Sequence, residues 1–316
     1  MTDGIINVYK EAGFTSHDVV AKLRGILHIK KIGHTGTLDP DATGVLSICV
    51  GRATKVCDML TDTDKTYEAE VIFGITSDTL DLSGTILSVK PVNITRDRLT
   101  SVLSQFIGET EQLPPMYSAV KVNGKKLYEY AREGKQVERK KRNVTIYGIE
   151  LIDSNLVEFD GKDADRMPEL PSAKIRVRCS KGTYIRSLCD DIGDRLGCGA
   201  VMGTLVRTAA GRFSTEGSLT LKEIEKTVSE NDNIDDIILP IDEVFQDMGE
   251  ARVKAEAMKL LINGNPLNEG SFEYFSFEKG EKQGEGFRVY GDDGEFYVVY
   301  KKDPRRDIYK VWKYFH

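Results

Sequence analysis

Residues 33–44 read GHTGTLDPDATG, and this short segment constrains the folded chain more than any other stretch. Its three glycines allow backbone conformations and close approaches that residues with a Cβ resist. Pro40 fixes the backbone just after Asp39 and favours an extended conformation at Asp39 itself. The segment therefore predicts a loop that can hold one carboxylate at a defined position against a ligand. A plain Asp-Pro turn is the alternative that local chemistry leaves open.

The hydrophobic pattern of the remaining chain predicts both helices and strands, and hence an α+β fold. We expect helices over residues 18–27, 51–60, 96–107, 185–196 and 221–230. We expect strands over residues 5–10, 67–74, 174–179, 287–290, 296–300 and 308–315. Thr15 or Ser16 can cap the first helix, and Gly182-Thr183 can cap the helix that ends at Gly197.

A length of 316 residues predicts two domains, at roughly 150 residues for each. After Leu239-Pro240 the pattern changes to short strands separated by glycine and charged turns. We therefore expect a large domain over residues 1–240 and a small β-rich domain over residues 250–316.

Composition excludes several classes of protein and of site. No apolar run approaches the roughly 18 residues of a membrane span, and the first residues lack the features of a signal peptide. We therefore expect a cytoplasmic protein without membrane contact. The five cysteines form no C-x-x-C pair and the four histidines no H-x-x-x-H pattern, so free thiols and no metal are expected. The glycine loop lacks the lysine of a phosphate-binding P-loop, and no G-x-S-x-G elbow is present, which argues against two common classes of hydrolase.

The net charge of −6 conceals two basic segments. Residues 214–250 hold eleven acidic residues against two lysines, so the rest of the chain is net positive. Residues 118–148 carry nine basic residues against three acidic ones, and residues 174–212 carry eight against three. The stretch 121–142 has few large apolar residues and is predicted to be an exposed basic arm. A polyanionic partner is therefore compatible with the acidic average.

A series of motifs runs along residues 5–213. In chain order they are Lys10 with GFTS at 13–16, the loop at 33–44, DKTY at 64–67, QLPPMYSAVK at 112–121, KGTYIRSL at 181–188 and LVRT at 205–208. In content and order they resemble the motifs of the tRNA pseudouridine synthases that modify uridine 55 in the T-arm, the bacterial TruB family. Glu11, where that family usually has proline, is a small departure. The segments 263–266 and 289–296 resemble a divergent PUA-like domain.

The resemblance implies a pseudouridine synthase fold, with a large mixed, mainly antiparallel sheet flanked by helices and loops and a small PUA-like C-terminal domain. It also assigns the catalytic residues. Asp39 would start the isomerisation of uridine, either as a nucleophile or as a base that removes a ribose proton. Arg186 would hold Asp39 ionised and in place, and Tyr67 would stack on the uracil and assist proton transfer at C5.

Four further residues are expected at the substrate by the same resemblance. His34 would fill the gap that the flipped uridine leaves, and Leu205 would form a wall of the pocket. Lys10 and Tyr184 would line the site. Taken alone, each of these residues also fits an ordinary structural role.

The basic arm at 121–142 would clamp the T-loop of tRNA through phosphate contacts, which bind without reading bases. The arm residues expected to bind RNA are Lys121, Lys125, Lys126, Arg139 and Lys140. We expect a monomer that needs no cofactor. A non-catalytic RNA-binding protein on the same scaffold and an RNA-guided relative that modifies ribosomal RNA are the alternatives. The set of Asp39, Tyr67 and Arg186 argues against the first, and the arm argues against the second.

Overall fold

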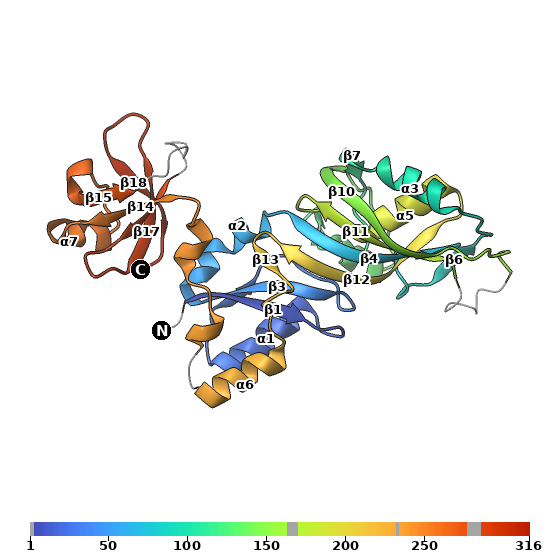
Figure 1. The fold of residues 1–316 in the computed structure, drawn as a ribbon, viewed down its shortest axis with the longest axis horizontal. Helices are drawn as coiled ribbons and strands as arrows, with labels where there is room; N and C mark the ends of the chain where they lie inside the picture. The colour runs from blue at the N-terminus through green and yellow to red at the C-terminus, as the bar shows by residue number, and fades with distance from the viewer. Residues whose placement is uncertain (1–2, 163–169, 232–233, 277–285) are drawn as a thin grey trace.

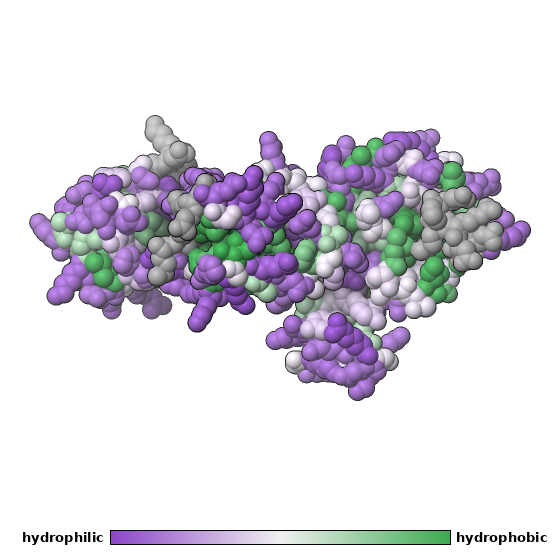
Figure 2. Space-filling model, turned by 90° about the horizontal axis from the view of Figure 1, so that it is seen from below, coloured by the Kyte–Doolittle hydropathy of each residue, from purple (hydrophilic) through white to green (hydrophobic). Residues whose placement is uncertain are grey.

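The computed structural model describes residues 3–162, 170–231, 234–276 and 286–316, and Figure 1 shows an elongated molecule. A large sheet with its helices forms the main body, and a β-rich part at the other end carries the C-terminus. The described residues include no helix that is long and apolar enough to cross a membrane. The face drawn in Figure 2 is largely hydrophilic, and its hydrophobic residues gather in separate patches.

The main body is built on a nine-stranded sheet whose path runs β1-β3-β12-β4-β11-β10-β7, with β2 paired to β3 and β13 to β12. Only β12 and β3 run parallel, so the sheet is mixed and mainly antiparallel. Along β11 the apolar side chains are buried and the basic ones exposed, as the alternating sequence predicts. The strands are β1 (Gly4–Lys10), β2 (Ile32–His34), β3 (Thr43–Val50), β4 (Lys65–Phe73), β7 (Gly108–Gln112), β10 (Arg142–Asn155), β11 (Ser172–Cys179), β12 (Ala200–Ala210) and β13 (Phe213–Ser214).

Two pairs of helices cover this sheet. Helices α1 (Ser16–Leu27) and α6 (Leu221–Asn231) share one apolar cluster with β1 and β3. Helices α3 (Arg96–Ser104) and α5 (Ile185–Leu196) share the largest cluster with β4, β11 and β12. These clusters fix the ends of β1 and β3 and the start of α5 relative to one another, and the candidate site lies between them.

Two small hairpins extend from the main body. Strands β5 (Ile75–Ser77) and β6 (Ile86–Val89) form one of them. Strands β8 (Lys121–Val122) and β9 (Lys125–Lys126) form the other, and the short helix α4 (Leu127–Arg132) follows directly.

The C-terminal part is a five-stranded sheet in the order β15-β14-β16-β17-β18. Its aromatic core is one apolar cluster, and in a second cluster Val299 and Phe315 pack with Ile5 and Phe245 of the preceding chain. The predicted division between residues 240 and 250 stays a prediction, although the new sheet begins at Gly249. Its elements are β14 (Gly249–Val253), α7 (Met258–Ile262), β15 (Phe272–Ser276), β16 (Phe287–Tyr290), β17 (Phe296–Lys302) and β18 (Tyr309–Tyr314).

Most predicted elements form near their expected bounds, with two differences. Residues 51–60 form a 3₁₀ helix (Gly51–Val56) followed by the short α2 (Cys57–Thr61), because Gly51 takes a φ of +60° and the Asp3 carboxylate accepts from the Arg52 amide. The predicted Thr183 cap of α5 is wrong. The Thr183 hydroxyl donates to the Ser180 carbonyl, and helix α5 begins after Tyr184 without a side-chain cap.

Candidate active site

Lys10, the last residue of β1, holds the loop at 35–42 in place through hydrogen bonds. The Lys10 side chain is fully buried, and its Nζ donates to the carbonyl oxygens of Glu11 (3.0 Å), Pro40 (2.8 Å) and Ala42 (2.6 Å). These bonds use the three donors of the ammonium group. Lys10, which we predicted to line the site, therefore acts on the shape of the loop.

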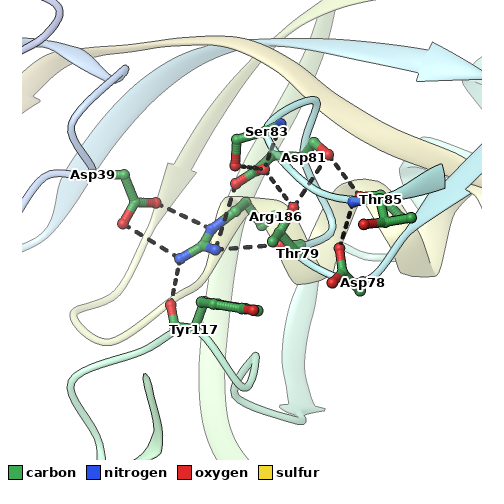
Figure 3. A network of polar contacts seen from close by, with 9 residues as sticks. Asp39, Asp78, Thr79, Asp81, Ser83, Thr85, Tyr117 and Arg186 are labelled. Atoms are coloured by element: carbon green, nitrogen blue, oxygen red, sulfur yellow. Dashed lines mark hydrogen bonds and ion pairs between the residues drawn. The ribbon is translucent and has the colours of Figure 1, made fainter. Parts of the chain in front are cut away.

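Asp39 projects from this loop toward Arg186 in the first turn of α5, as Figure 3 shows. Arg186 Nε lies 3.0 Å from Asp39 Oδ2, and Arg186 Nη2 lies 3.3 Å from Asp39 Oδ1. Such a two-point ion pair fixes both the position and the plane of a carboxylate. The Arg186 side chain is only 7% exposed, whereas that of Asp39 is 42% exposed. One side of the Asp39 carboxylate is thus bound to Arg186, and the other side is exposed to solvent.

Arg186 is fixed in turn by groups on the opposite side. Its Nη2 donates to the Tyr117 carbonyl at 2.8 Å and its Nη1 to the Thr79 carbonyl at 3.2 Å. Asp81 Oδ2 lies 3.5 Å from Nη1, so the guanidinium is shared between two carboxylates (Figure 3). Every part of its fork therefore has a partner.

Asp81 is a site residue that the sequence analysis missed. Its Oδ1 accepts from the hydroxyls of Thr79 and Ser83, both at 2.6 Å, and from the Ser83 amide at 3.0 Å. Leu80 between them takes a φ of +64°, which turns both Thr79 and Asp81 toward Arg186. In the sequence these residues predict only a polar turn, and the contact with Arg186 spans 105 positions. No local signal could have found it.

The start of α5 is clamped to the loop that precedes the basic arm. The buried Gln112 side chain accepts from the Tyr184 amide at 2.7 Å and donates to the Tyr184 carbonyl at 2.9 Å. Ser187 Oγ donates to the Leu113 carbonyl at 3.0 Å. Tyr184, a predicted lining residue, is half-buried, and its backbone sets where Arg186 begins. The motif residues from 112 to 118 and from 184 to 187 therefore act as one unit.

Charge and burial at this site oppose each other. Burial raises the pKa of the Asp39 carboxyl above its usual range, Arg186 acts to lower it, and Asp81 adds to the rise. Burial has the larger effect, so the expectation that Arg186 holds Asp39 ionised stays a prediction. Buried Lys10 also has a lowered pKa through the same loss of water.

Tyr67 and Leu205 lie on neighbouring strands in the core cluster that includes Leu38 of the loop. Tyr67 pairs in register with Arg207, and Leu205 with Ala69. Burial raises the pKa of Tyr67, the Arg207 guanidinium opposes the rise, and the nearby Asp39 carboxylate adds to it. Tyr67 therefore lies close to the Asp39 loop, and its contact with the uracil stays a prediction.

His34 ends β2 at the entrance to the loop. Its Nδ1 is buried without a hydrogen-bond partner in the described part of the protein, and its ring meets that of His17 edge-on with centroids 5.2 Å apart. Burial, and then the charges of His17 and Arg207, lower the pKa of His34. The ring is therefore held neutral near neutral pH, which suits contact with a base.

The basic arm is partly neutralised by its own residues. Lys125 forms an ion pair with Glu133, and Lys126 Nζ lies 5.4 Å from the centre of the Tyr128 ring. Arg139 Nη1 donates to the Pro114 carbonyl at 2.9 Å, which anchors the end of the arm. The remaining two predicted contacts, Lys121 and Lys140, are exposed. The described residues contain no group of His, Cys, Asp and Glu side chains that could hold a metal.

Two family models match most of the chain. The model described as "TruB family pseudouridylate synthase (N terminal domain)" matches residues 24–185, and the one described as "tRNA pseudouridylate synthase B C-terminal domain" matches residues 186–246. The chain belongs to the TruB family of pseudouridylate synthases. It is therefore a tRNA pseudouridine synthase, an isomerase. The boundary between the two matches falls at Arg186.

Relatives of this TruB-family chain are similar over most of their length. The tRNA pseudouridine synthase B of Lachnoclostridium phytofermentans is 49% identical over 316 residues, which is 99% of each chain. That of Bacillus cytotoxicus is 43% identical and covers 96% of this chain and 94% of its own.

Solved structures confirm the predicted fold class. A Cbf5-Nop10-Gar1 complex contains a chain with a TM-score of 0.68 and 26% identity, covering 99% of this chain and 85% of that one. An H/ACA RNP bound to a substrate RNA containing 2′-deoxyuridine gives a TM-score of 0.69 with the same coverage, at 24% identity. The similarity spans both sheets of the TruB-family chain.

Proposed function

We propose that the chain converts uridine 55 in the T-arm of tRNA to pseudouridine, and that Asp39 starts the reaction. The observation that carries the proposal is the Asp39 carboxylate, gripped on one side by Arg186 and open on the other. A protein that only bound RNA would have no use for a carboxylate built in this way. The match to the family's motifs at 33–44 and 181–188 supports the same assignment.

The chemistry needs no external reactant, because substrate and product are isomers. The C1′–N1 bond breaks and both of its electrons leave with the uracil. The uracil turns, C5 bonds to C1′, the proton on C5 is lost, and N1 gains a proton. Two routes fit a single carboxylate: Asp39 bonds to C1′ and is later displaced by C5, or Asp39 removes the C2′ proton and returns it afterwards. Tyr67, on the strand beside the loop, is proposed to stack on the uracil and to serve the proton transfer at C5.

Uridine within a folded tRNA must leave its stack to reach Asp39, at a cost of about a few kcal/mol. We assign the vacated position to His34, whose ring is neutral and whose Nδ1 is left without a partner in the described residues. Leu205, 8% exposed in the core beside Tyr67, is assigned to the pocket wall.

The basic arm at 121–142 is proposed to hold the T-arm through its phosphates, with a monomer as the active form. Residues 1–240 would form the catalytic domain and residues 250–316 a PUA-like domain. The arm belongs to this chain itself, and this supports binding of tRNA without a guide RNA.

Release of tritium from a T-arm stem-loop labelled at C5 of every uridine tests the proposal, with no guide RNA present. We expect release that corresponds to one uridine. A matched stem-loop with cytidine at position 55 should release none. Equal release from both stem-loops, or release only after a guide RNA is added, would contradict the assignment of the substrate.

A further inference from the structure

Arg207 is the largest fully buried side chain of the described part of the protein, at 1% exposure on β12. Its Nε donates to the Val45 carbonyl at 2.7 Å and its Nη2 to the Gly36 carbonyl at 3.1 Å. Among the described residues it forms no ion pair with a carboxylate. Burying a cation without such a partner is costly. A neutral donor could make the same two bonds at a lower cost of desolvation. A structural role alone therefore does not explain why the buried residue is charged.

The position of Arg207 in the sheet links the two halves of the site. On one side it pairs in register with Gly44, the end of the Asp39 loop, and on the other with Tyr67. Gly44 has a φ of +102°, and a Cβ there would lie 2.2 Å from the Arg207 carbonyl oxygen. The strands therefore approach too closely for any other residue at Gly44. Residues paired across neighbouring strands share a face, so the Arg207 and Tyr67 side chains lie together.

The contact between these two side chains has one direction. A guanidinium has donors and no acceptor, so a hydrogen bond between these neighbours runs from Arg207 to the Tyr67 oxygen, and the positive charge lowers the pKa of that phenol against the effect of burial. An oxygen that accepts from Arg207 has its own proton on another side. Tyr67 packs against the apolar cluster that includes Leu38, the residue before Asp39, so the Asp39 loop lies on that other side.

We propose that Arg207 is a positioning residue for the isomerisation, which donates to the Tyr67 oxygen and so turns the hydroxyl with its proton facing the substrate pocket. The inference rests on the proposed function, in which Tyr67 serves proton transfer at C5. It adds a residue that touches neither the substrate nor Asp39 and acts through Tyr67. The two hydrogen bonds from its side chain to the Val45 and Gly36 carbonyls also hold the Asp39 loop against Arg207.

A double-mutant cycle separates these two roles. The rate of tritium release in a single turnover is measured for the wild type, Arg207→Lys, Tyr67→Phe and the double variant. The Lys variant keeps the charge but loses the fork that holds both the loop and the phenol. We expect Arg207→Lys to slow the wild type by at least tenfold more than it slows the Tyr67→Phe protein, while affinity for the stem-loop stays within about twofold. Arg207→Met, without charge or donor, should be slower than Arg207→Lys in both backgrounds because it loses every bond to the loop, and by a larger factor where Tyr67 is present.

Thermal unfolding of each variant shows that it is folded, and if Arg207→Met fails to fold, the Lys cycle carries the test alone. An equal cost of Arg207→Lys in both backgrounds would overturn the inference, because Arg207 would then act through the loop only. A Tyr67→Phe protein as fast as the wild type would overturn it as well. Asp39→Asn, measured in the same assay, tests the proposed function separately. If Asp39→Asn is inactive but Arg207→Lys costs the same in both backgrounds, only the role of Arg207 is refuted and the proposed function stands.

Discussion

At the scale of single residues, the site depends on one guanidinium that serves two carboxylates. Arg186 grips Asp39 at two points and meets Asp81 at 3.5 Å on its far side. Asp81 is itself held by three donors from Thr79 and Ser83. The Arg186 fork has little freedom to rotate away, so Asp39 is presented in one geometry before the substrate arrives. Preorganisation of this kind supplies much of the rate in enzymes whose reacting groups must be aligned.

Asp81→Asn is predicted to slow pseudouridine formation by about 10²-fold, because loss of the charge loosens Arg186 and misplaces Asp39. Affinity for the stem-loop should be nearly unchanged, since Asp81 lies behind Arg186. Single-turnover rates and filter binding measure the two quantities. Asp78→Asn is the matched control: it keeps an acceptor for the Thr85 amide, 2.7 Å from Asp78 Oδ1, and should be as fast as the wild type. Equal rates for Asp81→Asn and the wild type would show that Asp81 does not hold Arg186 and Asp39 in their catalytic positions.

The same variant should change the pH dependence. Either route needs ionised Asp39, so the rate falls as the pH drops through the pKa of that carboxyl, which burial raises and Asp81 raises further. Removing the charge of Asp81 lowers the pKa of Asp39, so the acidic limb of the rate profile should move to lower pH. A shift to higher pH would contradict this electrostatic account.

At the scale of elements, the basic residues of the arm fall into two groups. Some hold the arm's own structure, and others are free to bind phosphate. Lys125 is paired with Glu133, and Arg139 holds the Pro114 carbonyl. Lys121 and Lys140 are exposed and form no ion pair within the described residues. Phosphate contacts should therefore come first from Lys121 and Lys140, whereas substitution of Arg139 should loosen the end of the arm.

Substituting Lys121→Ala together with Lys140→Ala is predicted to weaken binding of the stem-loop and to flatten its salt dependence. Each lost phosphate contact should reduce the slope of log K against log salt by about 0.7–0.9. Binding measured from low to moderate salt gives this slope. Lys222→Ala with Lys226→Ala, two exposed lysines of α6, is the matched control and should leave it unchanged. The same slope in both double variants would refute the role of the arm.

At the scale of the whole molecule, local sequence predicted elements but not their long-range contacts. Strand β11 follows from alternation and helix α5 from apolar residues at helical spacing, because burial on one face decides both. The contact of Asp81 with Arg186 and the register of Arg207 with Tyr67 depend on strands and turns that meet only in the folded sheet. The local sequence predicted that Asp39 lies in a loop that can hold it in place, but its pairing with Arg186 was predicted only through the family's motifs. The charge map was more informative than the net charge, because the most acidic stretch, 214–250, lies outside every catalytic motif.

The central claim is that the Asp39 carboxylate starts the isomerisation, and release of tritium from C5 of uridine 55 by Asp39→Asn tests it most directly. The variant keeps the size of the side chain and can still bond to Arg186, but it lacks a carboxylate to act as nucleophile or base. We predict that the wild type releases the label, and that Asp39→Asn releases none while it binds the stem-loop with an affinity close to that of the wild type. Release by Asp39→Asn at the rate of the wild type would contradict the account.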